Sequence, residues 1–262
     1  MSLYLISTKN DFTPNELIRF NRLYKHKINC GLFNEFEKIM VDYYRIKFHF
    51  SYANRIMYAR KLFRLYNQIY VTSNNYSAFL NEGILYDFVF NDAVNMALIF
   101  KKHTWTKNFI LKFKKYLDPL YENDAYNLSM SRLNFSLKKY DETLEFLNKM
   151  KCEKISYYYL SKFAKAKVFY ETGELNSIKY LINNLTDYLR DNKKLLPEDI
   201  MDIRLFNKFL ILLLKIRNTK NPSNLQLNLL KRELDASNTF VPNQTWFYEK
   251  INELYPIPKG LK

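Results

Sequence analysis

Residues 93 to 185 repeat at a step of 35 residues, and this repeat limits the folds that the chain can adopt. Five positions are apolar in all three copies, whereas steps of 34 or 31 from the same starting residues reach only polar side chains. A fixed period of this size is typical of helical hairpins that bury a common core by stacking on their neighbours. The five sets are Ala93/Leu128/Phe163, Leu98/Leu133/Val168, Phe100/Phe135/Tyr170, Trp105/Tyr140/Leu175 and Leu111/Phe146/Leu181.

The composition also favours an all-α protein. The chain has 262 residues, of which 48% are apolar and 17% aromatic, and this is enough for a sizeable core. Only four Gly and seven Pro are present, which leaves little material for strands, tight turns or phosphate-binding loops. The longest apolar run, 209–214, is far shorter than the roughly 18 residues of a membrane span. We therefore expect a soluble, cytoplasmic protein with no membrane partner.

The sequence predicts no catalytic centre, no cofactor and no metal site. Cys30 and Cys152 are isolated and lack metal or redox spacing, so reduced thiols in an intracellular protein are expected. His26, His49 and His103 are scattered and share no motif with a nucleophile. These observations favour a protein that binds a partner over one that catalyses a reaction.

Capping and helix-breaking residues divide the chain into helices. Thr13 and Pro14 begin a helix that ends near Gly31. Pro197 begins a helix that runs to about residue 216, and Asn221 is the expected N-cap of the next helix. Pro242 begins the last helix. The remaining expected helices are 32–49, 51–70 and 76–90, followed by the pairs 91–102 with 105–117, 124–137 with 140–151, and 156–171 with 174–191.

Three regions follow from this pattern. Residues 1–90 are expected to form helical hairpins that are degenerate repeats. Residues 91–191 hold the three clear repeats. Residues 192–262 hold a displaced helix pair and a capping helix, because the period slips after residue 191.

The stretches 131–147 and 166–181 resemble tetratricopeptide repeats. In that family a small residue in the first helix lets the second helix pack closely; Ser131 and Ala166 match this position, and Met96 does not. The resemblance implies a right-handed α-solenoid of antiparallel helix pairs, tetratricopeptide-like in its centre. It also implies a protein or peptide partner held on the concave face.

Other positions of the family pattern are matched in part. The aromatic residue near the inter-helix turn is present as Tyr140 and Trp105. The small residue of the second helix is present as Thr143, whereas Asn108 and Ile178 occupy the same place in the other copies.

Two basic residues, Arg132 and Lys167, lie one repeat apart at a position that faces the groove in this family. They are candidate contacts for an acidic peptide. The family's clamp for C-terminal carboxylates requires a Lys/Asn set that the groove positions of this chain do not match, so we do not expect that ligand.

A second candidate surface is the basic, aromatic segment 43–76, which has six Lys or Arg and no acidic residue. Arg60 and Arg64 are four residues apart and share a helix face, and Lys101 begins a further run of lysines. Basic grooves with stacking aromatics suit single-stranded nucleic acid. The step of 35 is also similar to that of pentatricopeptide repeats, which bind RNA. The opposing interpretation is that the aromatics form the core and the cations a solvated rim.

The formal net charge is +15, and residues 43–117 carry 12 basic and only 3 acidic residues. An anionic partner explains this excess, and so does an AT-rich genome, which the abundant Lys, Asn, Ile, Tyr and Phe suggest.

The sequence thus predicts a non-catalytic scaffold that binds a protein or peptide, with RNA binding as the alternative. The candidate contact residues are Arg60, Arg64, Lys101, Arg132 and Lys167.

Overall fold

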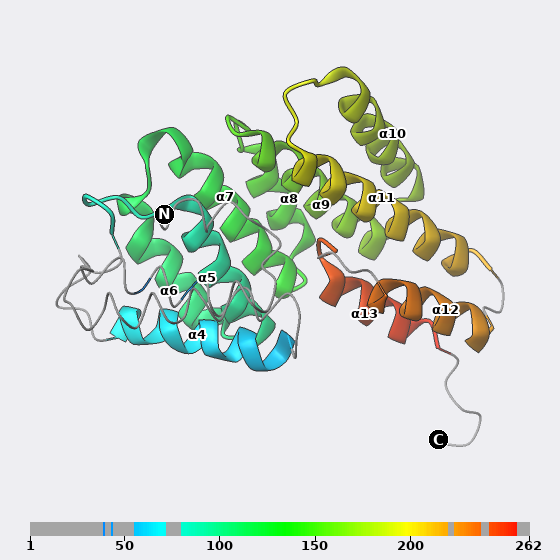
Figure 1. Ribbon diagram of the computed structural model, residues 1–262, viewed down its shortest axis with the longest axis horizontal. Coiled ribbons are helices and arrows are strands. Elements are labelled where there is room, and N and C mark those ends of the chain that lie inside the picture. The colour runs from blue at the N-terminus through cyan, green and yellow to red at the C-terminus, as the bar shows by residue number, and fades with distance from the viewer. Residues whose placement is uncertain are drawn as a thin grey trace, which may run out of the picture. The chain divides into compact units, whose positions relative to one another are not determined.

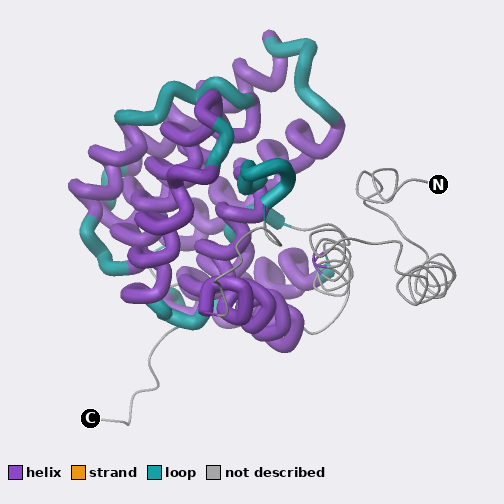
Figure 2. The backbone as a smooth tube through the Cα atoms, turned by 90° about the vertical axis from the view of Figure 1, so that its left-hand side faces the viewer, coloured by secondary structure: helices purple, strands orange, loops and turns teal. Residues whose placement is uncertain are grey.

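The protein is α-helical throughout the part of the chain that the structure describes. This computed structural model describes residues 39, 43, 55–71, 80–219, 223–236 and 241–255. Within these ranges there are two isolated β-bridges and no β-strand, and Figure 2 shows helices joined by short loops. The all-α class expected from the sequence is confirmed. No helix in these ranges combines the length and the apolar character that a membrane crossing requires.

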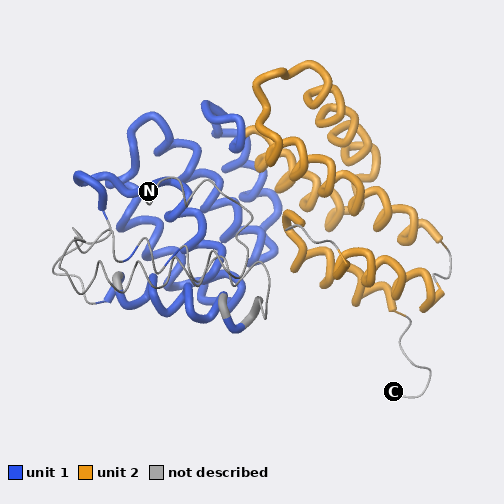
Figure 3. The backbone as a smooth tube through the Cα atoms, in the orientation of Figure 1, with its two compact units in different colours: residues 1–157 blue, residues 158–262 orange. Residues whose placement is uncertain are grey.

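The chain forms two compact units, residues 1–157 and 158–262 (Figure 3). The division falls inside a helix, between Tyr157 and Tyr158. The boundaries expected at 90/91 and 191/192 concern the organisation of the repeats and stay predictions.

The helices of unit 1 pack mainly against their neighbours in the sequence (Figure 1). They are α4 (Arg55–Val71), α5 (Asp87–Ile99), α6 (His103–Phe113), the 3-10 helix η2 (Lys114–Tyr116), α7 (Pro119–Ser136), α8 (Tyr140–Asn148) and the first turn of α9 (Ile155–Thr172). α5 contacts α4 and α6, and α7 contacts α8. α7 also contacts α5 and α6, so successive pairs share an interface.

Unit 2 contains the rest of α9 together with α10 (Leu175–Asp191), α11 (Pro197–Arg217), α12 (Asn224–Asp235) and α13 (Gln244–Glu253). α11 contacts α10, α12 and α13, and α12 contacts α13. The core of this unit is aromatic: the rings of Phe163 and Phe206 stack with centroids 3.9 Å apart, and Phe247 packs on Phe206.

Short polar contacts set where several helices begin. The Asp118 carboxylate accepts a hydrogen bond from the Leu120 N–H, with Pro119 as the first helical residue of α7. Ser223 caps α12, because its hydroxyl accepts from the Gln226 N–H and the Gln226 side chain accepts from the Ser223 N–H. The expected cap at Asn221 was therefore wrong.

The helix expected at 51–70 is confirmed over 55–70 as α4, while residues 51–54 lie outside the described residues. The helix expected from Pro197 to about residue 216 is confirmed as α11. The helix expected at 76–90 was wrong over 80–86. There the chain makes a tight turn in which Asn81 and Ile84 exchange two backbone hydrogen bonds of 2.9 Å, and Gly83 adopts a φ of 85°. The helices expected before residue 50, and residues 72–79, lie outside the described residues, apart from helical residues at 39 and 43.

The step between successive helix pairs differs along the chain. Each pair turns through one residue of positive φ, namely Lys101 at 52°, Lys138 at 60° and Gly173 at 82°. Lys101 and Lys138 lie 37 residues apart, whereas Lys138 and Gly173 lie 35 apart. The step of 35 therefore describes the second and third pairs, and the first pair is offset by two residues. The short helix η2, which follows α6, belongs to this longer first step.

This offset corrects part of the pattern predicted from the sequence. The residues of the first column, Ala93, Leu128 and Phe163, are all buried as expected, although a step of 37 back from Leu128 reaches Asn91 and not Ala93. The last column was wrong at Leu111, which is 46% exposed. Counting 37 residues back from Thr143 gives Thr106 in place of Asn108, and both threonines are fully buried and donate to the carbonyl oxygen four residues earlier.

The aromatic position near the turn was also assigned to the wrong residue in the first pair. Tyr140 and Leu175 are the first residues of α8 and α10, and the corresponding residue of α6 is His103. Trp105 instead stacks on Phe109 with centroids 4.9 Å apart, and its indole N–H donates to Asn67 Oδ1 of α4 at 2.9 Å. Trp105 thereby joins α6 to α4.

Candidate functional site

The predicted cations of α4 lie on one exposed face of that helix. Arg60 and Arg64 are both exposed, with Lys61 between them. Met57 and Val71 continue the same face toward the two ends of the helix and are 42% and 68% exposed. α4 therefore presents a basic stripe with apolar ends.

The aromatic residues interleaved with these cations face the opposite way. Tyr43 and Tyr66 are 1% exposed, and Phe63 and Tyr70 pack on Trp105 with centroid distances of 5.1 and 5.3 Å. In the described part of this segment the aromatics are thus mainly core residues, as the opposing interpretation of the sequence predicted. They are not a free platform on which bases stack.

Lys101 is exposed and forms the turn between α5 and α6. Its N–H donates to the Leu98 carbonyl at 2.9 Å, which closes the end of α5. This backbone hydrogen bond explains why Lys101 lies at the turn. No contact among the described residues brings its side chain close to the other candidate residues.

Arg132 lies in a polar cluster at the contact of α5, α7 and the start of α9, all within unit 1. Its Nη1 donates to Asn91 Oδ1 at 3.1 Å. Asn91 in turn donates to the Tyr157 hydroxyl at 3.1 Å, and that hydroxyl donates to Asp87 Oδ2 at 2.9 Å. Lys154 completes the cluster with an ion pair to Asp87 of 3.1 Å. We call these five residues the Arg132 cluster.

The guanidinium of Arg132 has a neutral partner. Among the described residues, Asn91 Oδ1 is the acceptor in hydrogen-bond range, and no carboxylate is in ion-pair range. From a longer distance, the negative charge of Asp92 raises the pKa of Arg132. The Asp92 carboxylate accepts a hydrogen bond of 2.5 Å from the Tyr43 hydroxyl.

Burial shifts the pKa values of two members of the cluster. Burial lowers the pKa of Arg132 to about 10, partly opposed by Tyr157 and Asp92. Burial and the Asp87 charge raise the pKa of the Tyr157 hydroxyl well above its usual value. At neutral pH the cluster therefore contains a cationic Arg132, a neutral Tyr157 and a compensated Lys154–Asp87 pair.

A buried carboxylate holds the loop that leads to this cluster. Asp124 is 1% exposed and accepts hydrogen bonds from three consecutive backbone N–H groups, those of Lys151, Cys152 and Glu153, at 2.7, 3.1 and 2.9 Å. Cys152 takes a φ of 59° within this loop. Lys154 and Tyr157 follow directly, so Asp124 positions two members of the Arg132 cluster.

The second predicted groove residue, Lys167, lies in unit 2 and has other neighbours. Its Nζ donates to Asn243 Oδ1 at 3.1 Å and lies 5.9 Å from the centre of the Trp246 ring. The contacts of Lys167 are thus separate from those of Arg132. Whether the two residues serve one partner stays a prediction.

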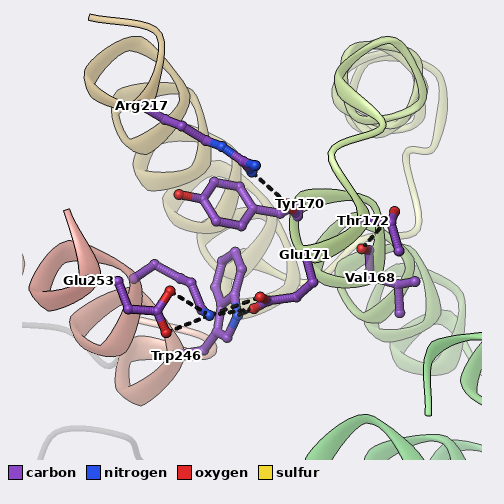
Figure 4. A network of polar contacts seen from close by, with 8 residues as sticks. Val168, Tyr170, Glu171, Thr172, Arg217, Trp246 and Glu253 are labelled. Atoms are coloured by element: carbon purple, nitrogen blue, oxygen red, sulfur yellow. Dashed lines mark hydrogen bonds and ion pairs between the residues drawn. The ribbon is translucent and has the colours of Figure 1, made fainter. Parts of the chain in front are cut away.

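Next to Lys167, unit 2 has a polar network in which Lys250 is paired with two carboxylates (Figure 4). The buried Lys250 ammonium lies 2.8 Å from a Glu171 oxygen and 2.8 Å from a Glu253 oxygen. The Trp246 N–H donates to Glu171 at 2.9 Å, and the Arg217 guanidinium donates to the Tyr170 carbonyl at 2.5 Å. This network joins α13 and α11 to the end of α9, and its Arg217 guanidinium, like that of Arg132, has a neutral hydrogen-bond partner.

Sequence reasoning missed Asp87, Asn91, Lys154 and Tyr157. Asn91 and Tyr157 are 66 positions apart, and no local motif connects them. The available signal was weak: Asn91 interrupts the apolar helix α5 on the side that faces α7.

Comparison of the chain with protein-family models, with curated proteins and with solved structures found no significant match. The geometry of the two units is therefore the basis for assigning a function.

Proposed function

We propose that this protein is a non-catalytic scaffold that binds an acidic protein or peptide segment, and that the Arg132 cluster is one of its contact sites. The proposal includes a tetratricopeptide-like, right-handed solenoid of antiparallel helix pairs whose first helices line the binding face. Its support is the packing of sequence-adjacent helices, with the interface between α5 and α7 joining two successive pairs.

The observation that carries the proposal is the neutral partner of Arg132. A half-buried guanidinium has lost part of its hydration, and a single bond to an amide oxygen compensates only part of that loss. A carboxylate that accepts two N–H groups in a bidentate arrangement supplies the missing charge and hydrogen bonds. Arg132 is therefore suited to an Asp or Glu side chain of a partner.

The surrounding residues favour a peptide over a free anion. Ser129 and Asn91 are neutral donors and acceptors beside Arg132, and the Ser129 hydroxyl is 3.4 Å from Asn91 Oδ1. Asp87 and Lys154 pair with each other, so the Asp87 carboxylate does not neutralise Arg132 and the Lys154 ammonium is not a free second cation for a phosphate. A single guanidinium among neutral polar groups matches one carboxylate together with peptide amides.

The test is binding of the full chain to an array of synthetic peptides that differ in Asp and Glu content. We expect binding to a subset of acidic peptides, and a loss of about tenfold or more in affinity for Arg132→Gln, equivalent to roughly 1.4 kcal/mol. The matched control is Arg204→Gln, which removes the same charge from an exposed arginine of α11. Equal affinity of Arg132→Gln and Arg204→Gln, or no binding to any acidic peptide, would contradict the proposal.

A second candidate function is binding of single-stranded RNA, favoured by the exposed stripe of Arg60, Lys61 and Arg64 on α4. The buried aromatics of the same segment argue against base stacking, so this binding would consist of phosphate contacts. Salt strongly weakens contacts to phosphates, so the salt dependence of affinity distinguishes RNA binding from peptide binding.

A further inference from the structure

A shallow groove in unit 2 lies between α10 and α11, and none of its residues belongs to the Arg132 cluster. Its volume is about 270 Å³, and its floor is formed by Ile182, Ile211 and Leu214. Lys179 and Lys215 flank the floor, together with two asparagine side chains. The groove residues come from the first half of α10 and the last half of α11.

The spacing of these residues follows from the two helices. Lys179 and Ile182 are three residues apart on α10, and Ile211, Leu214 and Lys215 lie within four residues on α11. Each helix therefore turns an apolar residue and a lysine toward the same groove. Ile211 is 37% exposed, so part of this apolar floor faces solvent.

The size of the groove points to side chains of a partner protein. Sites for small molecules have volumes of about 300–1,000 Å³ and enclose most of the ligand. This groove is smaller and open, which is enough for a few apolar side chains on one face of a helix.

The charge of the groove defines the partner further. Its lining, all of which the structure describes, contains two lysines and no Asp or Glu. A segment with carboxylates beside its apolar residues places opposite charges against Lys179 and Lys215. A second copy of this chain is a poorer match, because each copy carries a formal net charge of +15.

We infer that the groove between α10 and α11 binds an acidic amphipathic helix of a partner protein. Apolar side chains of that helix occupy the floor formed by Ile182, Ile211 and Leu214, and its carboxylates pair with Lys179 and Lys215. This goes beyond the proposed function, because it concerns a separate surface in unit 2 and does not require Arg132.

The probe is a fluorescein-labelled synthetic helix of Leu, Ala and Glu with leucines one turn apart, and its twin has Lys in place of every Glu. Binding to the full chain is measured by fluorescence anisotropy. We expect the acidic peptide to bind and the basic twin to bind at least about tenfold more weakly. The double variant Lys179→Glu/Lys215→Glu is expected to lose about tenfold or more in affinity for the acidic peptide.

Two matched controls separate the groove from general attraction to a basic protein. Lys193→Glu/Lys194→Glu makes the same change in net charge at exposed lysines between α10 and α11, and is expected to change affinity by less than about twofold. Ile211→Ser tests the floor, and Leu229→Ser is its control because Leu229 is 53% exposed on α12. Circular dichroism checks that each variant is folded.

Three results would overturn the inference: no binding of the acidic peptide, equal binding of its basic twin, or equal losses in the two double variants. Loss of binding in Arg132→Gln with no loss in Lys179→Glu/Lys215→Glu would assign the peptide to the Arg132 cluster and also reject the groove. If Arg132→Gln still binds the acidic peptide and Lys179→Glu/Lys215→Glu does not, the groove is supported as the binding site, whatever the peptide array shows for the Arg132 cluster.

Discussion

At the residue scale, the charged side chains of this protein differ in how their charge is compensated. Lys250 is 7% exposed and lies between the carboxylates of Glu171 and Glu253, an arrangement that stabilises α13 against α9. Arg132 has a single neutral acceptor. Because an uncompensated half-buried cation costs stability, the difference separates a structural pair from a candidate contact with a ligand.

Asp202 should make stability depend on pH. Burial, together with the nearby Asp199 and Glu198 charges, raises its pKa to about 7, well above the ordinary value of about 4. The folded state then binds more protons than the unfolded state between these two values, so this contribution to stability is present below about pH 4 and is lost as the pH rises toward about 7. We expect Asp202→Asn to be more stable than the wild type at about pH 8 and to lose less stability between about pH 5 and pH 8.

Urea titrations at the two pH values measure this difference. Glu249→Gln, a change at an exposed carboxylate of α13, is the control and is expected to follow the wild type. Equal changes in stability between the two pH values for the wild type and Asp202→Asn would contradict the assigned effect of Asp202.

At the element scale, the helices and their buried faces follow closely from the sequence, whereas the turn register of the first pair does not. Pro197 and the apolar run after it predicted α11 to within a residue. The step of 35 failed at the first pair because the true step of 37 reaches polar residues, Asn91 and His103, in two of the five columns, so the apolar pattern alone favoured the wrong register. Residues of positive φ locate the three turns between paired helices, and of these three residues only Gly173 has the residue type that signals a turn.

These turn residues give a prediction about backbone strain. A Cβ added at Gly173 meets no atom within 4 Å, so Gly173→Ala is expected to destabilise the chain by about 1 kcal/mol through its positive φ alone. Lys138 has the same backbone conformation, and Lys138→Gly is expected to stabilise by about 0.5–1 kcal/mol. Lys139→Gly, at a φ of −90°, is the control and should not stabilise. Chemical denaturation measures all three, and a stabilising Gly173→Ala would refute the interpretation.

At the scale of the whole molecule, the excess of basic residues favours any anionic partner, and the salt dependence of binding shows which kind it is. The described α4 stripe accounts for part of the excess in residues 43–117. The Arg132 cluster was only partly predictable, since its members come from α5, α7 and the start of α9 with the residue before it, which meet through packing within unit 1 and not through local sequence. Arg132 itself was predicted, but the residues that define its chemistry were not.

If the α4 stripe binds RNA, affinity for a mixed-sequence single strand should fall steeply with salt. Arg60→Ala/Arg64→Ala should reduce the slope of log affinity against log salt by about 1.4, since each phosphate contact on a single strand contributes about 0.7. Filter binding over a salt series measures the slope, with Lys193→Ala/Lys194→Ala as the control in unit 2. An absence of retention at low salt would exclude this function.

The carboxylate of Asp124 limits which changes of sequence this fold can accept. It accepts hydrogen bonds from three successive amides that directly precede α9, and it lies on a different helix, α7. The start of α9 is therefore anchored to α7 at one side chain, across the whole of α8. Loss of this acid would disturb Lys154 and Tyr157 even with every residue around Arg132 intact.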